Sequence, residues 1–195
     1  MEVYLDNAAT TRVFDEVREK INTVMDIDYG NPSSLHQKGV DAEKYIKEAK
    51  DIFSNILKVE GKTIYFTSGG TESNNTALIG GALARQRSGK RIISTRIEHP
   101  SVYNPLLFLE EQGFEVIFLN VDKHGIIDMN ELKEVMTPDT ILVSTMIVNN
   151  EMGAIEPVEE ISKYIKSVNP NVLYHVDAIQ GFGKLHIYPK RMGID

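Results

Sequence analysis

Apolar residues recur at helical spacing in two stretches near the start of the chain, residues 13–27 and 38–58. In the first stretch they are Val13, Val17, Ile21 and Val24. This spacing places the apolar side chains on one face of a helix. The sequence therefore predicts two helices, and the turn-forming segment YGNPSSLH (29–36) predicts a loop between them.

Beyond residue 62 the pattern changes to short β-branched or aromatic runs that alternate with helical segments. The predicted strands are 63–67, 91–95, 115–119, 140–148 and 172–176. The predicted helices between them are 72–87, 101–112, 129–136 and 157–168. Nearly continuous apolar strands separated by helices predict an α/β fold, a mainly parallel sheet with helices on both faces and right-handed crossovers.

This change of pattern divides the chain into three parts. Residues 1–12 form an N-terminal segment, 13–62 contain the two helices and their loop, and 63–195 contain the α/β domain. The final residues, KRMGID, are typical of the approach to another element, so we expect the chain to stop within the fold.

The composition narrows the possible partners. Of the 195 residues 42% are hydrophobic and 25% charged, as in an ordinary globular protein, and the net charge is −7. An acidic chain without a basic stripe argues against nucleic acid and anionic membranes as partners. No signal-peptide pattern opens the chain and no apolar run approaches about 20 residues, so we expect a cytoplasmic protein without a membrane span.

The chain contains no cysteine. Disulfides, zinc sites with thiolate ligands and a thiol nucleophile are therefore excluded within these residues.

Polar residues cluster at the ends of four predicted strands. The clusters are SGGTESNN (68–75), RIEHPS (96–101), NNEMG (149–153) and DAIQGFG (177–183). Ligands of open parallel α/β sheets bind beyond the carboxyl ends of the strands. Four polar clusters at that edge predict one shared binding site.

The first cluster has the features of an anion-binding site. Gly69 and Gly70 allow close approach to the backbone, Thr71 adds a hydroxyl, and a helix beginning near Glu72 presents unpaired N–H groups. A phosphate fits there. The alternative is that the segment is only a turn between a strand and a helix, with Thr71 and Glu72 capping the helix. The cluster does not match the Walker loop pattern.

Asp177 follows an apolar strand and should be at least partly buried. A buried carboxylate needs a cation or good hydrogen bonds, and a protonated pyridine nitrogen would be such a partner. The alternative is an aspartate that caps the next turn. His175 shares a strand face with Asp177, so a metal pair is conceivable, although further ligands are not evident.

His99 and Asn149 are the other candidates. An imidazole where strand gives way to helix could stack on a flat ring or transfer protons, although a solvated turn residue is the alternative. Asn149 and Asn150 could bind a ring hydroxyl or a substrate carboxylate, or they could simply favour a turn. The remaining histidines have no comparable setting: His36, His124 and His186.

Taken together, these segments resemble the cysteine desulfurase (NifS/IscS-like) branch of the class V aminotransferase-like enzymes, which use pyridoxal 5′-phosphate (PLP). The matching pieces are YLDNAATT (4–11), YGNPSSLH (29–36), FTSGGTESNN (66–75), EHPSV (98–102), VNNEMGAIEPV (148–158) and HVDAIQGFGK (175–184). The resemblance implies the large domain of a fold type I PLP-dependent transferase, truncated before its last strands, and makes 13–62 part of the small-domain and interface region.

The resemblance also implies roles for individual residues. Gly70 and Thr71 would hold the cofactor phosphate, and His99 would stack on the pyridine ring and help to move protons. Asn149 would sit beside the ring hydroxyl and the substrate.

Two further contacts to the ring follow from the same resemblance. Asp177 would pair with the ring nitrogen, and Gln180 would hydrogen-bond the ring hydroxyl. Members of this branch convert L-cysteine to L-alanine and pass sulfur, as an enzyme persulfide, to an acceptor protein such as an iron–sulfur scaffold. They are homodimers.

The chain departs from the family in what it lacks. The Schiff-base lysine of the family lies in a Ser-x-His-Lys segment one strand beyond the aspartate, and Lys184 and Lys190 do not match it. The persulfide cysteine and the substrate-binding arginine are also missing. The resemblance thus implies an N-terminal part that is inactive alone.

Two alternatives stay open. One is a truncated, non-catalytic paralogue that binds cofactor or a partner subunit. The other is a selenocysteine lyase or another class V enzyme, although VNNEMG together with SGGTESNN favours a desulfurase over an aminotransferase.

Overall fold

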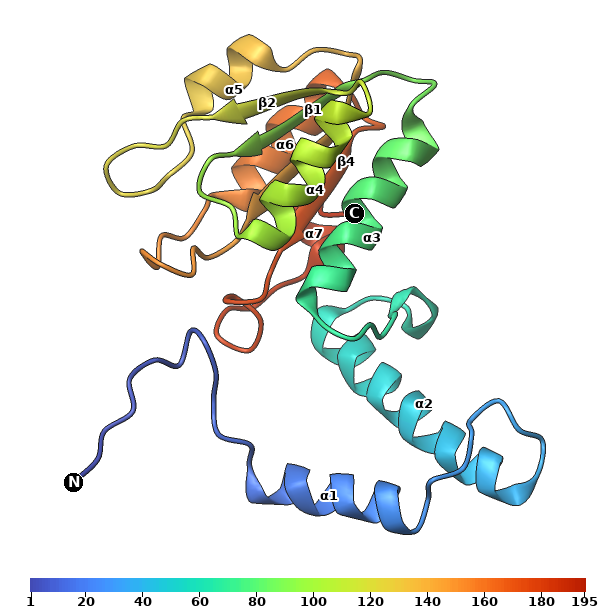
Figure 1. The fold of residues 1–195 in the computed structure, drawn as a ribbon. Coiled ribbons are helices and arrows are strands. Elements are labelled where there is room, and N and C mark those ends of the chain that lie inside the picture. Colours follow the sequence, from blue (N-terminus) through green and yellow to red (C-terminus); the bar gives the residue numbers. More distant parts are fainter. The chain divides into compact units, whose positions relative to one another are not determined.

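The computed structural model describes residues 1–195, which form two compact units, Met1–Tyr65 and Phe66–Asp195 (Figure 1). The larger unit contains every residue of the predicted site.

The smaller unit confirms the two predicted helices. They are α1 (Asp15–Asp26) and α2 (Gln37–Leu57), and a short 3-10 helix, η1 (Gly61–Thr63), follows. The Tyr45 hydroxyl on α2 donates to Asp28 at 2.6 Å, and Lys38 Nζ donates to the Ile27 carbonyl at 2.6 Å. A Cβ on Gly30 would lie 2.1 Å from the Lys38 carbonyl oxygen, so the loop between the helices packs directly on the start of α2.

The larger unit is a four-stranded sheet in the order β2-β1-β3-β4, with every neighbouring pair parallel. Its strands are β1 (Arg91–Thr95), β2 (Glu115–Leu119), β3 (Thr140–Met146) and β4 (Leu173–Asp177). Its helices are α3 (Gly70–Arg85), α4 (Pro100–Glu111), α5 (Met129–Val135), α6 (Val158–Val168) and α7 (Pro189–Met192).

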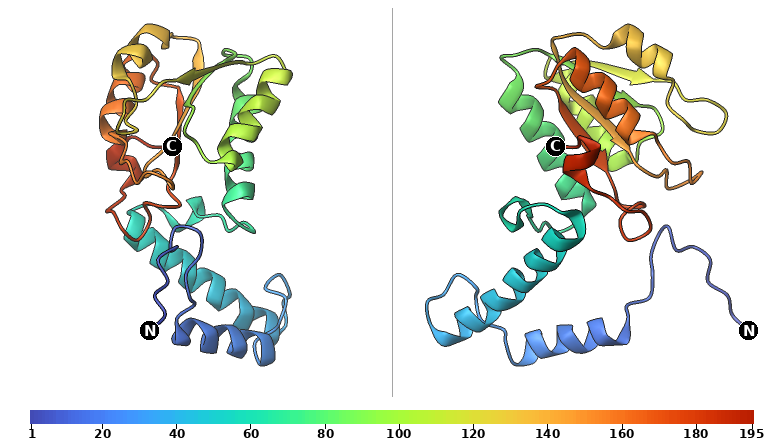
Figure 2. Two further views of the ribbon diagram at one scale, coloured as in Figure 1. Left: turned by 60° about the vertical axis from the view of Figure 1, so that its left-hand side comes forward. Right: turned by 180° about the vertical axis from the view of Figure 1, so that it is seen from behind.

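Helices cover both faces of this sheet. Figure 2 shows α3 and α4 on one face and α5, α6 and α7 on the other. The predicted α/β fold with a parallel sheet is therefore confirmed. None of the helices combines the length and the apolar character that crossing a bilayer requires.

Alternation along the strands builds a core on each face. Ile92 and Leu142 are paired in register and pack with residues of α3 and α4. Their neighbours Ile93 and Val143 point to the opposite face, because successive side chains of a strand alternate. Tyr174 shares that face and is fully buried, with its hydroxyl 2.8 Å from Thr145 Oγ1.

The predicted strand at 63–67 is wrong. Thr63 ends a 3-10 helix, and the next N–H, that of Ile64, donates to the Gly61 carbonyl within the same turn. The following residues belong to no sheet, and Tyr65 is 81% exposed. β-branched and aromatic residues favour extended backbone, but a strand also needs a neighbouring backbone to pair with.

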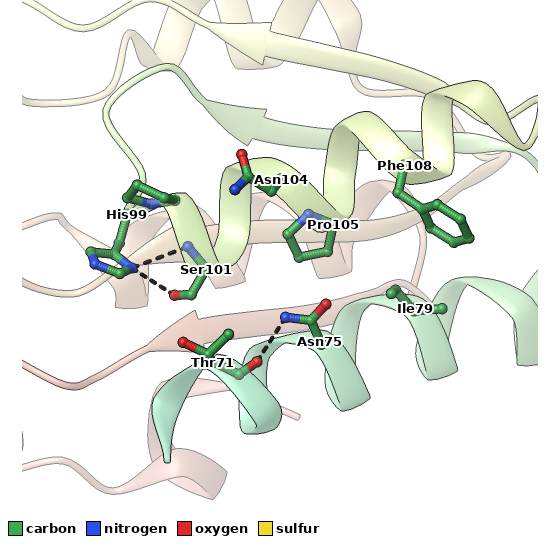
Figure 3. Close-up of a pocket in the computed structure, with 9 residues that line it drawn as sticks. Thr71, Asn75, Ile79, His99, Ser101, Asn104, Pro105 and Phe108 are labelled. Carbon is green, nitrogen blue, oxygen red and sulfur yellow. Dashed lines mark hydrogen bonds between the residues drawn. The ribbon is translucent and has the colours of Figure 1, made fainter. Parts of the chain in front are cut away.

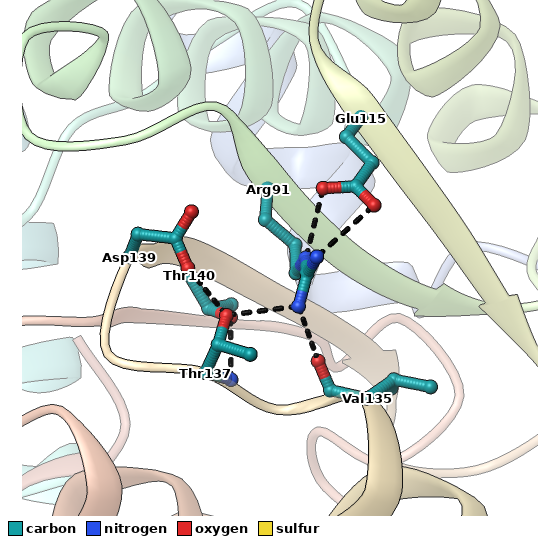
Figure 4. Close-up of polar contacts among 6 residues, drawn as sticks. All are labelled: Arg91, Glu115, Val135, Thr137, Asp139 and Thr140. Carbon is teal, nitrogen blue, oxygen red and sulfur yellow. Dashed lines mark hydrogen bonds and ion pairs between the residues drawn. The ribbon is translucent and has the colours of Figure 1, made fainter.

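Arg91 closes the amino-terminal end of the sheet (Figure 4). From the first position of β1 its Nε and Nη2 donate to the two carboxylate oxygens of Glu115 on β2, at 2.9 and 3.1 Å. Its Nη1 donates at 3.0 Å to the Val135 carbonyl and to Thr137 Oγ1, at the end of α5. One guanidinium thus ties β1 to β2 and to the connection that leads into β3.

Arg91→Ala should lower the free energy of unfolding by about 1–3 kcal/mol, since it removes four bonds from a charged donor, two of them to the partly buried acceptors of Val135 and Thr137. Arg191→Ala is the matched control, because the Arg191–Glu159 pair is 65% and 59% exposed, and it should cost less than about 1 kcal/mol. Urea denaturation followed by circular dichroism measures both. Equal losses in the two variants would contradict the role given to Arg91.

Candidate functional site

The carboxyl ends of β1, β3 and β4 bring three of the four predicted clusters to one edge of the sheet. The fourth cluster, residues 68–75, reaches that edge as the start of α3, whose buried Asn74 contacts Asp177 at the end of β4.

The start of α3 leaves its first turn without a side-chain cap. Gly69 is the N-cap residue, and no side chain accepts a hydrogen bond from the first turn. The Glu72 carboxylate instead accepts from the Ser68 N–H at 2.7 Å and from its hydroxyl at 2.6 Å. These bonds lower the pKa of Glu72 and close the preceding loop. The N–H groups of the first turn can therefore face an anion.

A pocket of about 560 Å³ lies between α3 and α4 (Figure 3). Its polar end holds Thr71, His99 and Ser101, and its other end is apolar. The remaining lining residues are Asn75, Ile79, Pro100, Asn104, Pro105 and Phe108. The structure thus brings two of the predicted site residues, Thr71 and His99, to one cavity.

His99 is fixed at the start of α4, where it is the N-cap residue. Its Nδ1 accepts a hydrogen bond from the Ser101 N–H at 3.1 Å and lies 2.8 Å from Ser101 Oγ. Pro100 occupies the first helical turn, where the missing N–H costs nothing. The imidazole is therefore held in place at one ring nitrogen while the side chain stays exposed in the pocket.

Asp177 is buried, as predicted, with 7% of its surface exposed. Its Oδ1 accepts from the Ile179 N–H and its Oδ2 from Asn74 Nδ2, both at 2.9 Å. Asn74 Nδ2 also donates to Ser101 Oγ at 2.9 Å. Asn74 therefore connects the carboxylate at the end of β4 to the serine that holds His99.

The sequence interpretation missed Asn74. A signal was available, because Asn74, Leu78 and Ala82 follow one another at four-residue spacing and all three are buried. A polar residue on the apolar stripe of a helix must find hydrogen-bond partners inside the protein.

His175 belongs to the same group of side chains. Its Nδ1 lies 2.8 Å from Ser144 Oγ and its Nε2 lies 3.2 Å from Asn74 Oδ1. Burial lowers the pKa of His175 to about 4, against an opposing effect of the Asp177 carboxylate. No group of three or more His, Cys, Asp or Glu side chains could hold a metal ion, so a metal site built on His175 and Asp177 lacks its further ligands.

Asn149 is buried in the turn after β3, and its amide is engaged on all sides. Its Nδ2 donates to the Ile97 carbonyl at 3.0 Å and lies 3.1 Å from Met146 Sδ. Its Oδ1 accepts from the Glu151 N–H at 2.9 Å and the Met152 N–H at 2.8 Å. The side chain thus holds the loop before His99 against the turn that contains Asn149.

Gly70 begins α3, and Gln180 lies in the turn after β4. A Cβ on Gly70 would come within 2.9 Å of Ile179 Cδ1, so the start of α3 and this turn approach each other closely. Gln180 Oε1 accepts from Lys184 Nζ at 3.1 Å.

A second buried carboxyl group, Glu98, was also missed. Its Oε1 accepts from Thr95 Oγ1 at 2.7 Å and from the Met146 N–H at 3.1 Å, whereas its Oε2 is buried without a partner. Burial raises the pKa of Glu98 to about 8, and the nearby Asp177 and Glu156 carboxylates act in the same direction. At neutral pH this edge of the sheet therefore carries a protonated carboxyl group beside Asp177.

This shift predicts a loss of stability on the alkaline side. Because the folded-state pKa of Glu98 (about 8) exceeds its ordinary value of 4.5, its contribution is complete below pH 4.5 and is lost as the pH rises through 8. The lowered pKa of His175 changes the free energy of unfolding only below pH 6.5, its ordinary pKa. Above that pH the two buried glutamates, Glu98 and Glu156, therefore dominate the pH dependence. Between pH 6.5 and 8 the free energy of unfolding should fall by about 1–2 kcal/mol.

Glu98→Gln should flatten this fall, since the amide keeps an acceptor for Thr95 and Met146 but does not ionise. Glu110→Gln, at an exposed position on α4, is the control and should retain the wild-type slope. The same slope in wild type and Glu98→Gln would contradict the assignment.

Comparison with known proteins finds relatives that match this chain over nearly its whole length. Residues 3–195 match the family model described as aminotransferase class-V. Cysteine desulfurase IscS of Dictyoglomus turgidum is 42% identical over 194 residues, which are 100% of this chain and 49% of the relative. Cysteine desulfurase IscS 1 of Archaeoglobus fulgidus is 43% identical over 192 residues, 98% of this chain and 50% of the relative.

Solved structures give the same result. A NifS-like protein matches with a TM-score of 0.97 and 38% identity over 100% of this chain and 54% of its own. SspA in complex with cysteine matches with a TM-score of 0.90 and 34% identity over 98% of this chain and 55% of its own. The chain spans about half the length of the relatives it matches.

These matches confirm the resemblance to cysteine desulfurases that the sequence motifs indicated. With its family model matched from residue 3 to residue 195, the chain belongs to the class-V aminotransferase family.

Proposed function

We propose that this chain supplies the PLP-binding residues of a cysteine desulfurase, which converts L-cysteine to L-alanine and transfers the sulfur. The observation that carries the proposal is the buried Asp177 carboxylate, linked through Asn74 and Ser101 to the imidazole of His99. A fixed carboxylate and a fixed imidazole at one sheet edge are what a protonated, planar pyridine ring requires.

The donor set fits the three parts of the cofactor. The uncapped first turn of α3, with the Thr71 hydroxyl, offers donors to a phosphate. Asp177 offers a carboxylate oxygen to a protonated ring nitrogen, and His99 offers the flat face of its imidazole. When bound there, PLP would supply an electron sink for bonds at the α-carbon of an amino acid.

Each residue would then have one task. Gly70 and Thr71 bind and orient the phosphate, and Asp177 keeps the proton on the ring nitrogen. His99 covers the ring and excludes water from that side.

Asn149 and Gln180 would act near the ring hydroxyl. The Asn149 amide already holds the loop before His99, so its contribution is to position that loop. Gln180 would contribute its amide from the turn after β4.

The other requirements of the reaction would come from outside these residues. We place the lysine that holds PLP covalently, the sulfur-carrying cysteine and the substrate-binding arginine in a further polypeptide segment. The relatives are about twice as long as this chain, which supports that division. L-cysteine as the substrate is supported by the neighbouring structure named as a complex with cysteine. A homodimer and an acceptor protein, such as an iron–sulfur scaffold, complete the proposal.

A second candidate is a non-catalytic subunit that binds cofactor or a complete partner subunit. The coding sequence after residue 195 separates the candidates. A continuation with Ser-x-His-Lys and a later cysteine supports the desulfurase, whereas a stop codon supports the non-catalytic subunit. L-selenocysteine or an amino-group acceptor as the preferred substrate would identify another class V activity.

Asp177→Asn should weaken PLP binding at least about tenfold, because it replaces the charged partner of the ring nitrogen with a neutral amide. Absorbance titration with PLP measures the Kd. Asp128→Asn is the control: Asp128 caps α5, a role that asparagine fills equally well, and the Kd should not change. Unaltered affinity in Asp177→Asn would remove Asp177 from the site, and no binding to the wild-type chain would remove the proposed function.

PLP should bind the 195-residue chain reversibly, since neither Lys184 nor Lys190 matches the Ser-x-His-Lys lysine of the family. Borohydride treatment followed by peptide mass spectrometry should find no single stoichiometric adduct, and dialysis should release the cofactor. A stoichiometric adduct on Lys184 or Lys190, or L-alanine formed from L-cysteine by this chain alone, would contradict the division of labour.

A further inference from the structure

Six side chains form one continuous, branched hydrogen-bond network beside the pocket. Asn74 lies at the branch point, with Nδ2 2.9 Å from both Ser101 Oγ and Asp177 Oδ2, and Oδ1 3.2 Å from His175 Nε2. Ser144 Oγ ends one arm, 2.8 Å from His175 Nδ1, and His99 Nδ1 ends another, 2.8 Å from Ser101 Oγ.

The chemistry of these groups determines which one donates and which one accepts in each hydrogen bond. A carboxylate oxygen accepts hydrogen bonds and cannot donate, so the NH₂ group of Asn74 must face Asp177. The opposite amide orientation would set two acceptor oxygens against each other. Both N–H bonds of Asn74 are then used, one toward Asp177 and one toward Ser101.

The first arm follows from the amide oxygen. Because Asn74 Oδ1 accepts only, His175 Nε2 must carry a hydrogen and donate it. His175 is neutral near pH 7, since burial lowers its pKa to about 4. Its Nδ1 is therefore unprotonated and accepts from the Ser144 hydroxyl.

The second arm ends at the pocket. Ser101 Oγ accepts from Asn74, which leaves its own hydrogen free to point at His99 Nδ1. The Ser101 backbone N–H also points at that nitrogen, at 3.1 Å. A ring nitrogen that accepts two hydrogen bonds carries no hydrogen, so in neutral His99 the hydrogen resides on Nε2.

We propose that Asn74 is a positioning residue, which holds the Asp177 carboxylate and, through Ser101, fixes His99 as its Nε2–H tautomer. His99 then offers the pocket an N–H donor instead of a lone pair. It can donate a hydrogen bond to a bound molecule, but cannot accept a proton at Nε2 while that hydrogen remains. The tautomer rests on the contacts alone, whereas its consequence for PLP rests on the proposed function.

Two-bond ¹H–¹⁵N spectra of the ¹⁵N-histidine-labelled chain at pH 8, without PLP, test the tautomers directly. His99→Gln and His175→Gln assign the resonances. Both rings should show a protonated Nε2 and a hydrogen-bonded, unprotonated Nδ1. A protonated Nδ1 in His99, or a rapid average of the two tautomers, would overturn the proposal.

Asn74→Asp tests the branch point with a side chain of the same shape. The new carboxylate cannot donate to Ser101 and would draw the Ser101 hydroxyl hydrogen toward itself, so the His99 Nδ1 resonance should move toward that of a nitrogen with a weaker hydrogen bond. Ser101→Ala should move it in the same direction, and Ser101→Thr should restore it. These two variants keep the test decisive if Asn74→Asp does not fold.

Ser162→Ala is the matched control. Ser162 is a buried serine whose hydroxyl donates to the Gly193 carbonyl on the other side of the sheet, and its loss should leave the His99 resonances unchanged. An unchanged His99 spectrum in both Asn74→Asp and Ser101→Ala would also overturn the proposal.

A PLP titration of the same proteins separates this inference from the proposed function. Asn74→Asp should raise the Kd at least about tenfold, because a second carboxylate would disturb Asp177. If wild-type chain shows the predicted tautomers and binds no PLP, the proposed function fails and the tautomer assignment stands. If PLP binds normally and His99 is the Nδ1–H tautomer, the inference fails and the proposed function stands.

Discussion

The side-chain amide of Asn74 satisfies three polar groups at the carboxyl edge of the sheet, and the arrangement of the site depends on it. Without its N–H groups, Asp177 would lose one of its two donors and Ser101 would lose the bond that orients its hydroxyl. Without its oxygen, the His175 Nε2–H would lose its acceptor. An unsatisfied buried polar group costs about 1–3 kcal/mol, so the three bonds support one another.

Side-chain hydrogen bonds have different roles at the two ends of the sheet. At the amino end, Arg91 donates to Glu115 and to the connection after α5, and these bonds join the strands. At the carboxyl end, Asn74 makes its hydrogen bonds to side chains inside the protein, and Thr71 and His99 line a pocket beside them. The strands are thus tied together at one end, and the other end can hold exposed groups in fixed positions.

Periodicity predicted the elements well, because apolar spacing reports directly which face of a helix or strand is buried. It could not tell extended backbone from a paired strand, which is why 63–67 was misassigned. The residues at strand ends, Asp177 and His99 among them, were predictable from the rule that parallel sheets bind ligands at that edge. The burial of Asn74 was predictable from its place on the apolar stripe of α3, but its partner was not, because Asp177 lies 103 positions away in sequence.

Glu98 was missed for a related reason. It belongs to the same strand-end cluster as His99, but an acidic residue in a loop is usually solvated, and only the tertiary packing buries it.

Glu98 also bears on the charge of the site. Two carboxyl groups close together in a poorly solvated edge cannot both ionise without mutual repulsion. The surroundings differ: Asp177 has an N–H donor at each oxygen, whereas the Oε2 of Glu98 has none. With its pKa raised to about 8, Glu98 keeps its proton at neutral pH and leaves Asp177 without a charged carboxylate neighbour at that position. Under the proposed function, a protonated ring nitrogen at this edge would then meet the Asp177 carboxylate, which Asn74 already orients.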